Sequence, residues 1–310
     1  MVEIHADDYA LTVNTSKEML ILMKDGVLDG ISVIANNPCC DECKGYLLDA
    51  IPSLPFLPVM SVHLNLVEGL SLSGCMGTSS DSSQVLISET WASLFAASFI
   101  PFYRKKMKKA LKAEIRSQID EGKRFIDECV EKAALCGVSC KQKALRIDSH
   151  QHTHMIPVVW SALVEIIDEN EYDVEYIRNS KEPWQPFVSC AELVPTFRFA
   201  NRVKNRLLNL LSGPVDRYCK RMGLRPMYLW GLMMSGRMDK DRVVKLYPSM
   251  LERAEADGRD LEILFHPGRM TDDEEYRGIP KKSADDFYLS VGRDIEKEGA
   301  RKCRELTAVS

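Results

Sequence analysis

The chain has 310 residues, of which 45% are hydrophobic and 28% are charged, and its formal net charge is −4. This composition is typical of an ordinary globular protein with a sizeable core and excludes a disordered or fibrous chain. The small negative charge gives no electrostatic reason to expect a nucleic-acid partner. No stretch is both long and apolar enough to predict a membrane span, so we also expect no membrane partner.

The cysteines bear on the cellular compartment. The chain has ten of them; Cys39, Cys40 and Cys43 lie close together, and the other seven are dispersed without the spacing of a disulfide framework. No second C-x-x-C pair follows Cys40 and Cys43 at the distance of a zinc ribbon. The first residues also lack the basic and apolar regions of a secretory signal. We therefore expect free thiols in a cytoplasmic protein, with a metal or redox site at these cysteines as the less favoured alternative.

Short apolar runs alternate with helical patterns along the chain. Runs that predict buried strands are Val2–His5, Gly30–Ala35, Phe56–Leu64, Ala144–Asp148, Val174–Ile177, Met227–Trp230 and Leu261–Phe265. The spacing of apolar residues predicts helices over Val13–Lys24, Lys105–Ala134, Val158–Ile167 and Asn201–Met222. Repeated strand–helix alternation implies parallel strands joined by right-handed crossovers. Seven such units predict an α/β protein that forms a single seven-stranded (β/α) barrel domain over residues 1–310.

Two segments are predicted as insertions into this barrel. Residues 67–89 are rich in Ser and Gly and predict a long, mobile polar loop. Residues 184–225 contain a basic stretch with helical spacing. We expect solvated surface at Gly69–Ser83 and at Arg202–Arg221, with a contribution to the cleft or to a homodimer contact as the alternative. No G-x-G-x-x-G follows a predicted strand, so a dinucleotide site is not expected.

Polar side chains with catalytic chemistry follow the ends of the predicted strands. They are Asp7, Asp8, His63, His150, Arg178 and His266. The carboxyl ends of barrel strands converge on one mouth, so these residues are expected to share one face. Imidazole and carboxylate are the ligands that a borderline divalent metal prefers, and both act as acids and bases in hydrolysis. The pattern predicts a metal-dependent hydrolase.

Each of these positions also has a purely structural interpretation. The heptad Asp148–His154 contains three alternating histidines, His150, His152 and His154, and could be a polar helix cap with surface imidazoles. We expect the strand to end near Ser149, so that only one or two of the imidazoles reach a metal. His63 could be a hydrogen-bonded core residue.

The Asp7–Asp8 pair and His266 likewise allow two interpretations. Adjacent carboxylates are usually a solvated loop, but two like charges this close cannot both ionise cheaply unless a cation neutralises one. One carboxylate would then bind metal while the other accepts a proton. His266 precedes Pro267-Gly268 and is either a turn residue or a general acid.

These residues resemble the YdjC-type carbohydrate deacetylases, the family that includes ChbG-like chitooligosaccharide deacetylases and HpnK-like proteins of the hopanoid pathway. Four motifs carry the resemblance: His5–Ala10, Ser61–Leu66, Ile147–Pro157 and Glu262–Gly268. The third is the most specific. This chain departs from the family pattern within the first motif, where His5, Tyr9 and Ala10 replace Asn, Phe and Gly.

The resemblance implies a seven-stranded β/α barrel and a role for each site residue. A divalent metal ion would be held by Asp8, His63 and His150, with Asp7 as general base and His266 as general acid. Arg178 would orient Asp7. Asp148, His152 and His154 would support the site. By ligand softness, zinc suits the metal ligands best, with magnesium, cobalt or manganese as alternatives.

The function expected from this resemblance is removal of an N-acetyl group from an amino sugar or a short chitooligosaccharide. One alternative is a metal-dependent phosphoesterase or amidohydrolase on a β/α barrel, although such proteins usually carry their H-x-H pair on the first strand. A second alternative is a non-catalytic sugar-binding relative. The presence of both Asp7 and His266 argues against the latter.

Overall fold

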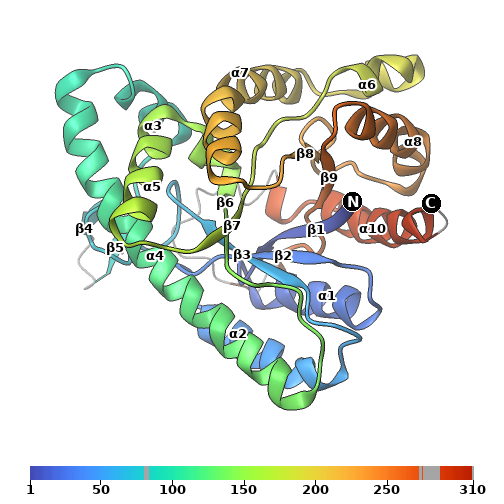
Figure 1. The fold of residues 1–310 in the computed structure, drawn as a ribbon, viewed down its shortest axis with the longest axis horizontal. Coiled ribbons are helices and arrows are strands. Elements are labelled where there is room, and N and C mark those ends of the chain that lie inside the picture. Colours follow the sequence, from blue (N-terminus) through green and yellow to red (C-terminus); the bar gives the residue numbers. More distant parts are fainter. Residues whose placement is uncertain (80–83, 272–273, 275–286, 309–310) are drawn as a thin grey trace.

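The computed structural model describes residues 1–79, 84–271, 274 and 287–308. Its centre is a parallel sheet of seven strands in the spatial order β7-β6-β3-β2-β1-β9-β8 (Figure 1). The strands are β1 (Val2–Tyr9), β2 (Gly30–Val33), β3 (Val59–Leu64), β6 (Leu145–Ser149), β7 (Val174–Ile177), β8 (Met227–Trp230) and β9 (Asp260–Phe265). All seven predicted strands are present; β7 and β8 have the predicted bounds, and the ends of the other five differ from the prediction by one to four residues.

The sheet is curled but does not close, so the predicted barrel is correct in strand number and direction and wrong in closure. Among the described residues, the end strands β7 and β8 share no ladder. The amide of Leu229 in β8 instead donates a hydrogen bond of 3.0 Å to the carbonyl of Lys181, beyond the end of β7. Both end strands have only four residues, and this stagger leaves too little overlap for a ladder.

Helices cover the outside of the curled sheet (Figure 1). They are α1 (Val13–Lys24), α2 (Cys40–Ala50), α3 (Trp91–Ala97), α4 (Pro101–Cys136), α5 (Pro157–Glu169), α6 (Gln185–Ser189), α7 (Phe199–Met222), α8 (Lys240–Ala256) and α10 (Gly292–Thr307), with 3₁₀ turns η1 (Ile51–Ser53), η2 (His150–Met155) and η3 (Ala191–Thr196). The four predicted helices are all present. None of the helices in the described part of the chain combines the length and apolar character that a bilayer-spanning segment needs.

The segment predicted as a long mobile loop is anchored to α4 where it is described. The buried carboxylate of Glu114 accepts hydrogen bonds from the hydroxyls of Ser71 and Ser73, each 2.7 Å, and from the amide of Leu72 at 3.0 Å. A short hairpin follows, formed by β4 (Thr78–Ser79) and β5 (Val85–Leu86). A buried carboxylate requires such donors, so α4 fixes the start of this segment. Residues 80–83 lie outside the described part of the chain.

Candidate active site

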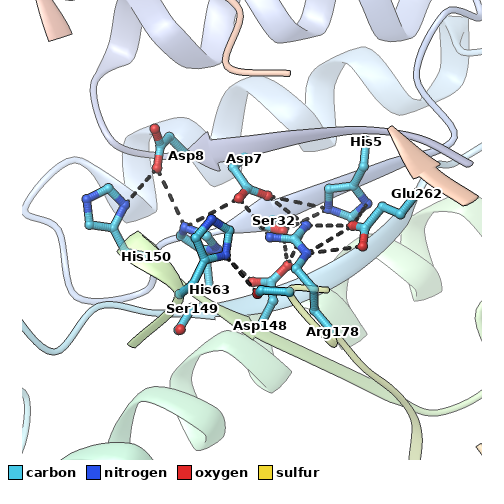
Figure 2. A network of polar contacts seen from close by, with 12 residues as sticks. His5, Asp7, Asp8, Ser32, His63, Asp148, Ser149, His150, Arg178 and Glu262 are labelled. Carbon is cyan, nitrogen blue, oxygen red and sulfur yellow. Dashed lines mark hydrogen bonds and ion pairs between the residues drawn. The ribbon is translucent and has the colours of Figure 1, made fainter. Parts of the chain in front are cut away.

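The end of β1 is bent at the two adjacent carboxylates. The strand does not stop at His5, as predicted, but continues to Tyr9, and its pairing with β2 shifts register after Ala6. Asp8 has a φ of +73°, in the left-handed region. A bulge of this kind re-aims side chains that would otherwise alternate across the sheet. Asp7 therefore faces Arg178 and Asp8 faces His150, while Nε2 of His63 lies within 4.0 Å of both carboxylates (Figure 2).

The three residues predicted to bind metal lie together. The Oδ1 atom of Asp8 is 3.6 Å from Nε2 of His63 and 3.1 Å from Nδ1 of His150. All three side chains are buried, and their ligand atoms lie within 4.8 Å of one another. They come from β1, β3 and the turn that follows β6, and Figure 2 shows Asp8 facing both imidazoles. One divalent cation fits this group of donors.

A carboxylate lies behind each of the two imidazoles. Nδ1 of His63 is 2.6 Å from Oδ1 of Asp148, and Nε2 of His150 is 2.7 Å from Oε1 of Glu68. The hydroxyl of Tyr288 also lies 2.8 Å from Nε2 of His150. Such outer carboxylates fix the tautomer and orientation of metal-binding histidines. The remaining nitrogens, Nε2 of His63 and Nδ1 of His150, face Asp8.

The electrostatics of this group favour one bound positive charge. Burial alone would lower the pKa of His150, but the carboxylates of Glu68 and Asp8 outweigh it and raise that pKa to about 10. Burial would raise the pKa of Asp8, but His150 and Arg293 hold it well below its usual value. Arg293 donates a 2.9 Å hydrogen bond to Oδ2 of Asp8, which leaves Oδ1 for the imidazoles. A cation at Oδ1 would take the place of the proton on His150.

Two other groups of acidic and histidine side chains are close enough for a metal but are less suited to one. They are Glu3–His5–Glu262 and His5–Asp7–Asp148. Both ring nitrogens of His5 are engaged, by Glu3 at 2.9 Å and by the Ser32 hydroxyl at 2.7 Å. Arg178 donates to Glu262 at 2.6 Å. His5, Glu3 and Glu262 do not line the cavity described below, whereas His63 and His150 do.

Asp7 is held by Arg178 through two hydrogen bonds. The guanidinium nitrogens lie 2.7 and 2.9 Å from the two carboxylate oxygens, and the same guanidinium contacts Asp148 and Glu262 (Figure 2). Burial would raise the pKa of Asp7, but the charge of Arg178, aided by His63, lowers it to about 2. Asp7 is therefore ionised and fixed in orientation.

The histidine heptad is divided by the turn after β6. The strand ends at Ser149, and Gln151 and His152 adopt positive φ angles of 53° and 59°. His150 alone of the three joins the Asp8 cluster. Nδ1 of His152 lies 2.9 Å from the Ser180 hydroxyl, and the His152 ring lines the cavity.

His154 is not part of the cluster and is fully buried. Its Nδ1 lies 2.5 Å from the Ser149 hydroxyl, and its Nε2 lies 2.7 Å from the carbonyl of Arg178. These contacts tie the turn after β6 to the end of β7. His154 therefore holds the main chain that presents His150 and Arg178.

A cavity of about 360 Å³ opens at the carboxyl ends of the strands. Its wall includes Asp7, His63, His150, His152 and His266 from the strand ends, Arg198, Asn201 and Lys204 from α7 and its N-cap, and Phe287 and Tyr288. This volume lies within the range of small-ligand sites. Most of the residues predicted to act in catalysis thus share one cavity.

His266 lies on the cavity wall after β9. Its Nδ1 is 3.3 Å from Oε2 of Glu296, and the same carboxylate accepts hydrogen bonds from the amides of His266 and Gly236. Nε2 has no hydrogen-bond partner among the described residues. The imidazole is thus oriented by a carboxylate on one side and is free to donate on the other.

Several residues at the site were not predicted. Glu68 lies in the segment predicted as a long, mobile polar loop, yet its side chain is only 1% exposed. No sequence signal marks Glu68, because it lies in an irregular segment that does not directly end a strand. Arg293 and Glu296 come from α10, where no strand end marks them.

Comparison with known proteins identifies the family. The sequence profile of the YdjC-like proteins matches residues 139–309, more than half of the chain. The chain belongs to the YdjC-like family. The matched part includes His150 and His266, whereas Asp8 and His63 precede it and join them through the geometry above.

A solved structure supports the fold of this YdjC-like protein. A proposed cellobiose-phosphate cleavage protein from Enterococcus faecalis V583 superimposes with a TM-score of 0.53 and 14% sequence identity, over 99% of this chain and 94% of that chain. At this identity the likeness concerns the fold alone. A comparison with curated protein sequences found no significant match.

Proposed function

We propose that the protein is a metal-dependent hydrolase that removes the N-acetyl group from an amino sugar or a short oligosaccharide. The observation that carries this proposal is the group of Asp8, His63 and His150 beside a cavity whose wall also contains Asp7 and His266. Membership of the YdjC-like family supports a carbohydrate substrate, as does the sugar named for the Enterococcus protein. The many free thiols favour a cytoplasmic location.

Asp8, His63 and His150 would hold one divalent cation. Two imidazoles and one carboxylate suit zinc best, and magnesium, cobalt and manganese are alternatives. When bound, the cation would lower the pKa of a water molecule and stabilise negative charge on the acetamide oxygen.

The side chains of the cavity divide the acid and base roles. The Asp7 carboxylate is ionised, and Arg178 holds it in place, so it can accept the proton of the attacking water. His266, oriented by Glu296, can donate a proton from Nε2 to the departing amine, which is otherwise a poor leaving group. This arrangement assigns different roles to the two adjacent carboxylates, with Asp7 as base and Asp8 as ligand.

The direct test is the release of acetate from N,N′-diacetylchitobiose by protein loaded with zinc or magnesium and by chelated protein. We expect release from the loaded protein and almost none after chelation. If loaded protein releases no acetate from any N-acetylated sugar, the substrate assignment is wrong.

Asp7→Asn and Asp8→Asn separate the two carboxylates. Asp7→Asn should lower kcat by about 100-fold to 10,000-fold and leave metal affinity intact, because Asp7 acts on the proton and not on the cation. Asp8→Asn should lose the metal itself. Calorimetric titration with zinc, run beside the acetate assay, distinguishes them; loss of metal from Asp7→Asn would reassign Asp7 as a ligand.

A second candidate is hydrolysis of a phosphate ester, which the cations of the cavity favour. Arg198 and Lys204 both line the cavity, and burial lowers the pKa of Lys204 to about 8. Either would attract an anionic group. Release of inorganic phosphate from a sugar phosphate, without release of acetate from its N-acetylated form, would select this candidate.

A further inference from the structure

The beginning of α4 and the turn before it form an exposed apolar surface bordered by basic side chains. Phe99, Ile100 and Phe102 have exposed fractions of 66%, 53% and 84%. The segment from Phe99 to Lys112 contains six basic residues and no acidic one, in a chain whose net charge is −4. We call residues 99–109 the α4 tip. Large exposed apolar side chains grouped in this way usually mark an interaction surface.

Most of the basic residues of the α4 tip are free to meet a partner. Lys108 and, beyond the tip, Lys112 pair with Glu165 of α5. The other four are exposed, and within the described ranges their side chains form no ion pair; they are Arg104, Lys105, Lys106 and Lys109. The tip thus combines three exposed apolar side chains with four uncompensated positive charges.

The α4 tip projects beyond the edge of the sheet that carries the candidate site. Gly122 of α4 packs against Val62 of β3, and nearer the helix start the Gln118 side chain donates a 2.7 Å hydrogen bond to the carbonyl of Asn65, just past the end of β3. The helix therefore runs antiparallel to β3. Its 36 residues span about 54 Å, against about 20 Å for the six residues of β3. Figure 1 shows this teal part of α4 extending away from the sheet.

We propose that the α4 tip docks on the surface of a membrane that contains anionic lipids. Aromatic and aliphatic side chains insert at the boundary between headgroups and acyl chains, and nearby Lys and Arg side chains contact anionic headgroups. Neither signal alone gives stable attachment, and the α4 tip supplies both. The sequence analysis predicted no membrane partner from the net charge and from the lack of a spanning segment. The net charge of the whole chain does not show a local basic segment, and docking on a membrane surface does not require a spanning helix.

The charges of the α4 tip favour a lipid surface over other partners. In a symmetric dimer the same patch would face itself, so four unpaired cations would oppose four. A nucleic-acid duplex would use the cations but not the three exposed apolar side chains. An anionic bilayer satisfies both features of the patch.

The experiment is co-sedimentation of the full chain with vesicles of phosphatidylcholine alone and of phosphatidylcholine mixed with phosphatidylglycerol. We expect binding to the mixed vesicles that weakens as salt is added, and little binding to neutral ones. Equal binding to both kinds of vesicle, or none to either, would overturn the proposal. The outcome does not depend on the proposed enzyme activity.

Two pairs of substitutions locate the binding on the α4 tip. Lys105→Glu with Lys106→Glu should lower the partition coefficient by at least about 25-fold, since each basic residue contributes about fivefold. Phe99→Ser with Phe102→Ser should lower it by at least about tenfold. The matched controls are Phe199→Ser, at an 80% exposed phenylalanine of α7, and Lys220→Glu at an exposed lysine of the same helix.

Thermal unfolding checks that each variant is folded. The substituted side chains of the α4 tip and of the controls are all exposed, so the melting temperature should change little. If the control variants lose as much binding as the tip variants, the α4 tip is not the docking surface. If the tip variants leave vesicle binding intact but convert a dimer to a monomer in analytical ultracentrifugation, the surface joins two copies of the chain and the proposal is wrong.

Discussion

The role of each residue at the site depends on the side chains that it contacts more than on its residue type. Asp7 and Asp8 are chemically identical neighbours, yet the bend at Asp8 aims one at Arg178 and the other at His63 and His150. The first is thereby fixed as an ionised carboxylate, and the second becomes part of a ligand group. The same contrast separates His150, which faces Asp8, from histidines nearby in the heptad.

Glu68 is predicted to set the affinity of the site for its cation. Glu68→Gln removes the carboxylate that contacts Nε2 of His150. Loss of a carboxylate that orients a metal-binding histidine usually weakens metal binding by about 10-fold to 100-fold, and we expect the same loss here. Asp148→Asn, behind His63, should act in the same way. Calorimetric titration with zinc measures both, with the partly exposed Glu165→Gln on α5 as control. Unchanged affinity in Glu68→Gln would show that His150 is not oriented through this carboxylate.

The residues predicted at the site are those that a simple rule can find. Asp8, His63 and His150 directly follow or end apolar strands, and the carboxyl ends of parallel strands meet at one edge. Glu68 and Arg293 follow no such rule, because one lies in an irregular segment and the other on a helix face. Which loop or helix reaches the site depends on tertiary packing that local periodicity does not encode.

At the scale of elements, the turn after β6 shows how a structural histidine supports a functional one. His154 is buried and hydrogen-bonded to Ser149 and to the main chain of Arg178. It thereby joins the ends of β6 and β7, which present His150 and Arg178. His154 contributes to the site by fixing the backbone of this turn.

His154 should make stability depend on pH. Burial lowers its pKa from 6.5 to about 4, so the folded state favours the neutral ring. Its contribution is therefore complete above pH 6.5 and is lost as pH falls from 6.5 through about 4, up to about 3 kcal/mol in total. Urea unfolding across this range should show a smaller decline for His154→Gln than for the unchanged protein. Equal declines would mean that His154 does not resist protonation.

The contact between α4 and β3 gives a second prediction at this scale. A Cβ atom at Gly122 would lie 2.8 Å from Cγ2 of Val62, so Gly122→Val should push the helix from the sheet and destabilise the fold by about 1–3 kcal/mol. Gly45→Val, in α2 with no atom within 4 Å, is the control and should lose much less. Urea titration gives both values, and Val62→Ala should partly rescue Gly122→Val. If both variants lost the same free energy of unfolding, the close contact between Gly122 and Val62 would not explain the effect.

Periodicity predicts the seven strands and four of the helices but not the whole arrangement. The predicted helices do not include α8, which has Pro248 in its interior, or α10, which carries few apolar residues. The failure of the barrel to close has a similar origin. Whether β7 and β8 meet depends on their length and stagger. The apolar runs predict the length of both strands correctly, but the stagger between them is not visible in these runs.

At the scale of the whole molecule, the curled parallel sheet explains why distant residues meet. Strands β1, β3, β6, β7 and β9 all end at one edge, and α10 returns from the end of the chain to the same place. The cavity lies at this edge, and the α4 tip projects beyond it. The proposed chemistry and the proposed membrane contact therefore belong to one end of the molecule.

The most direct test of the account is the position of a bound metal. Crystals soaked with cobalt(II) and measured at the cobalt absorption edge would locate the cation by anomalous scattering. We predict one strong peak within bonding distance of Oδ1 of Asp8, Nε2 of His63 and Nδ1 of His150. A peak between Glu3, His5 and Glu262 instead, or none near Asp8, would contradict the central claim.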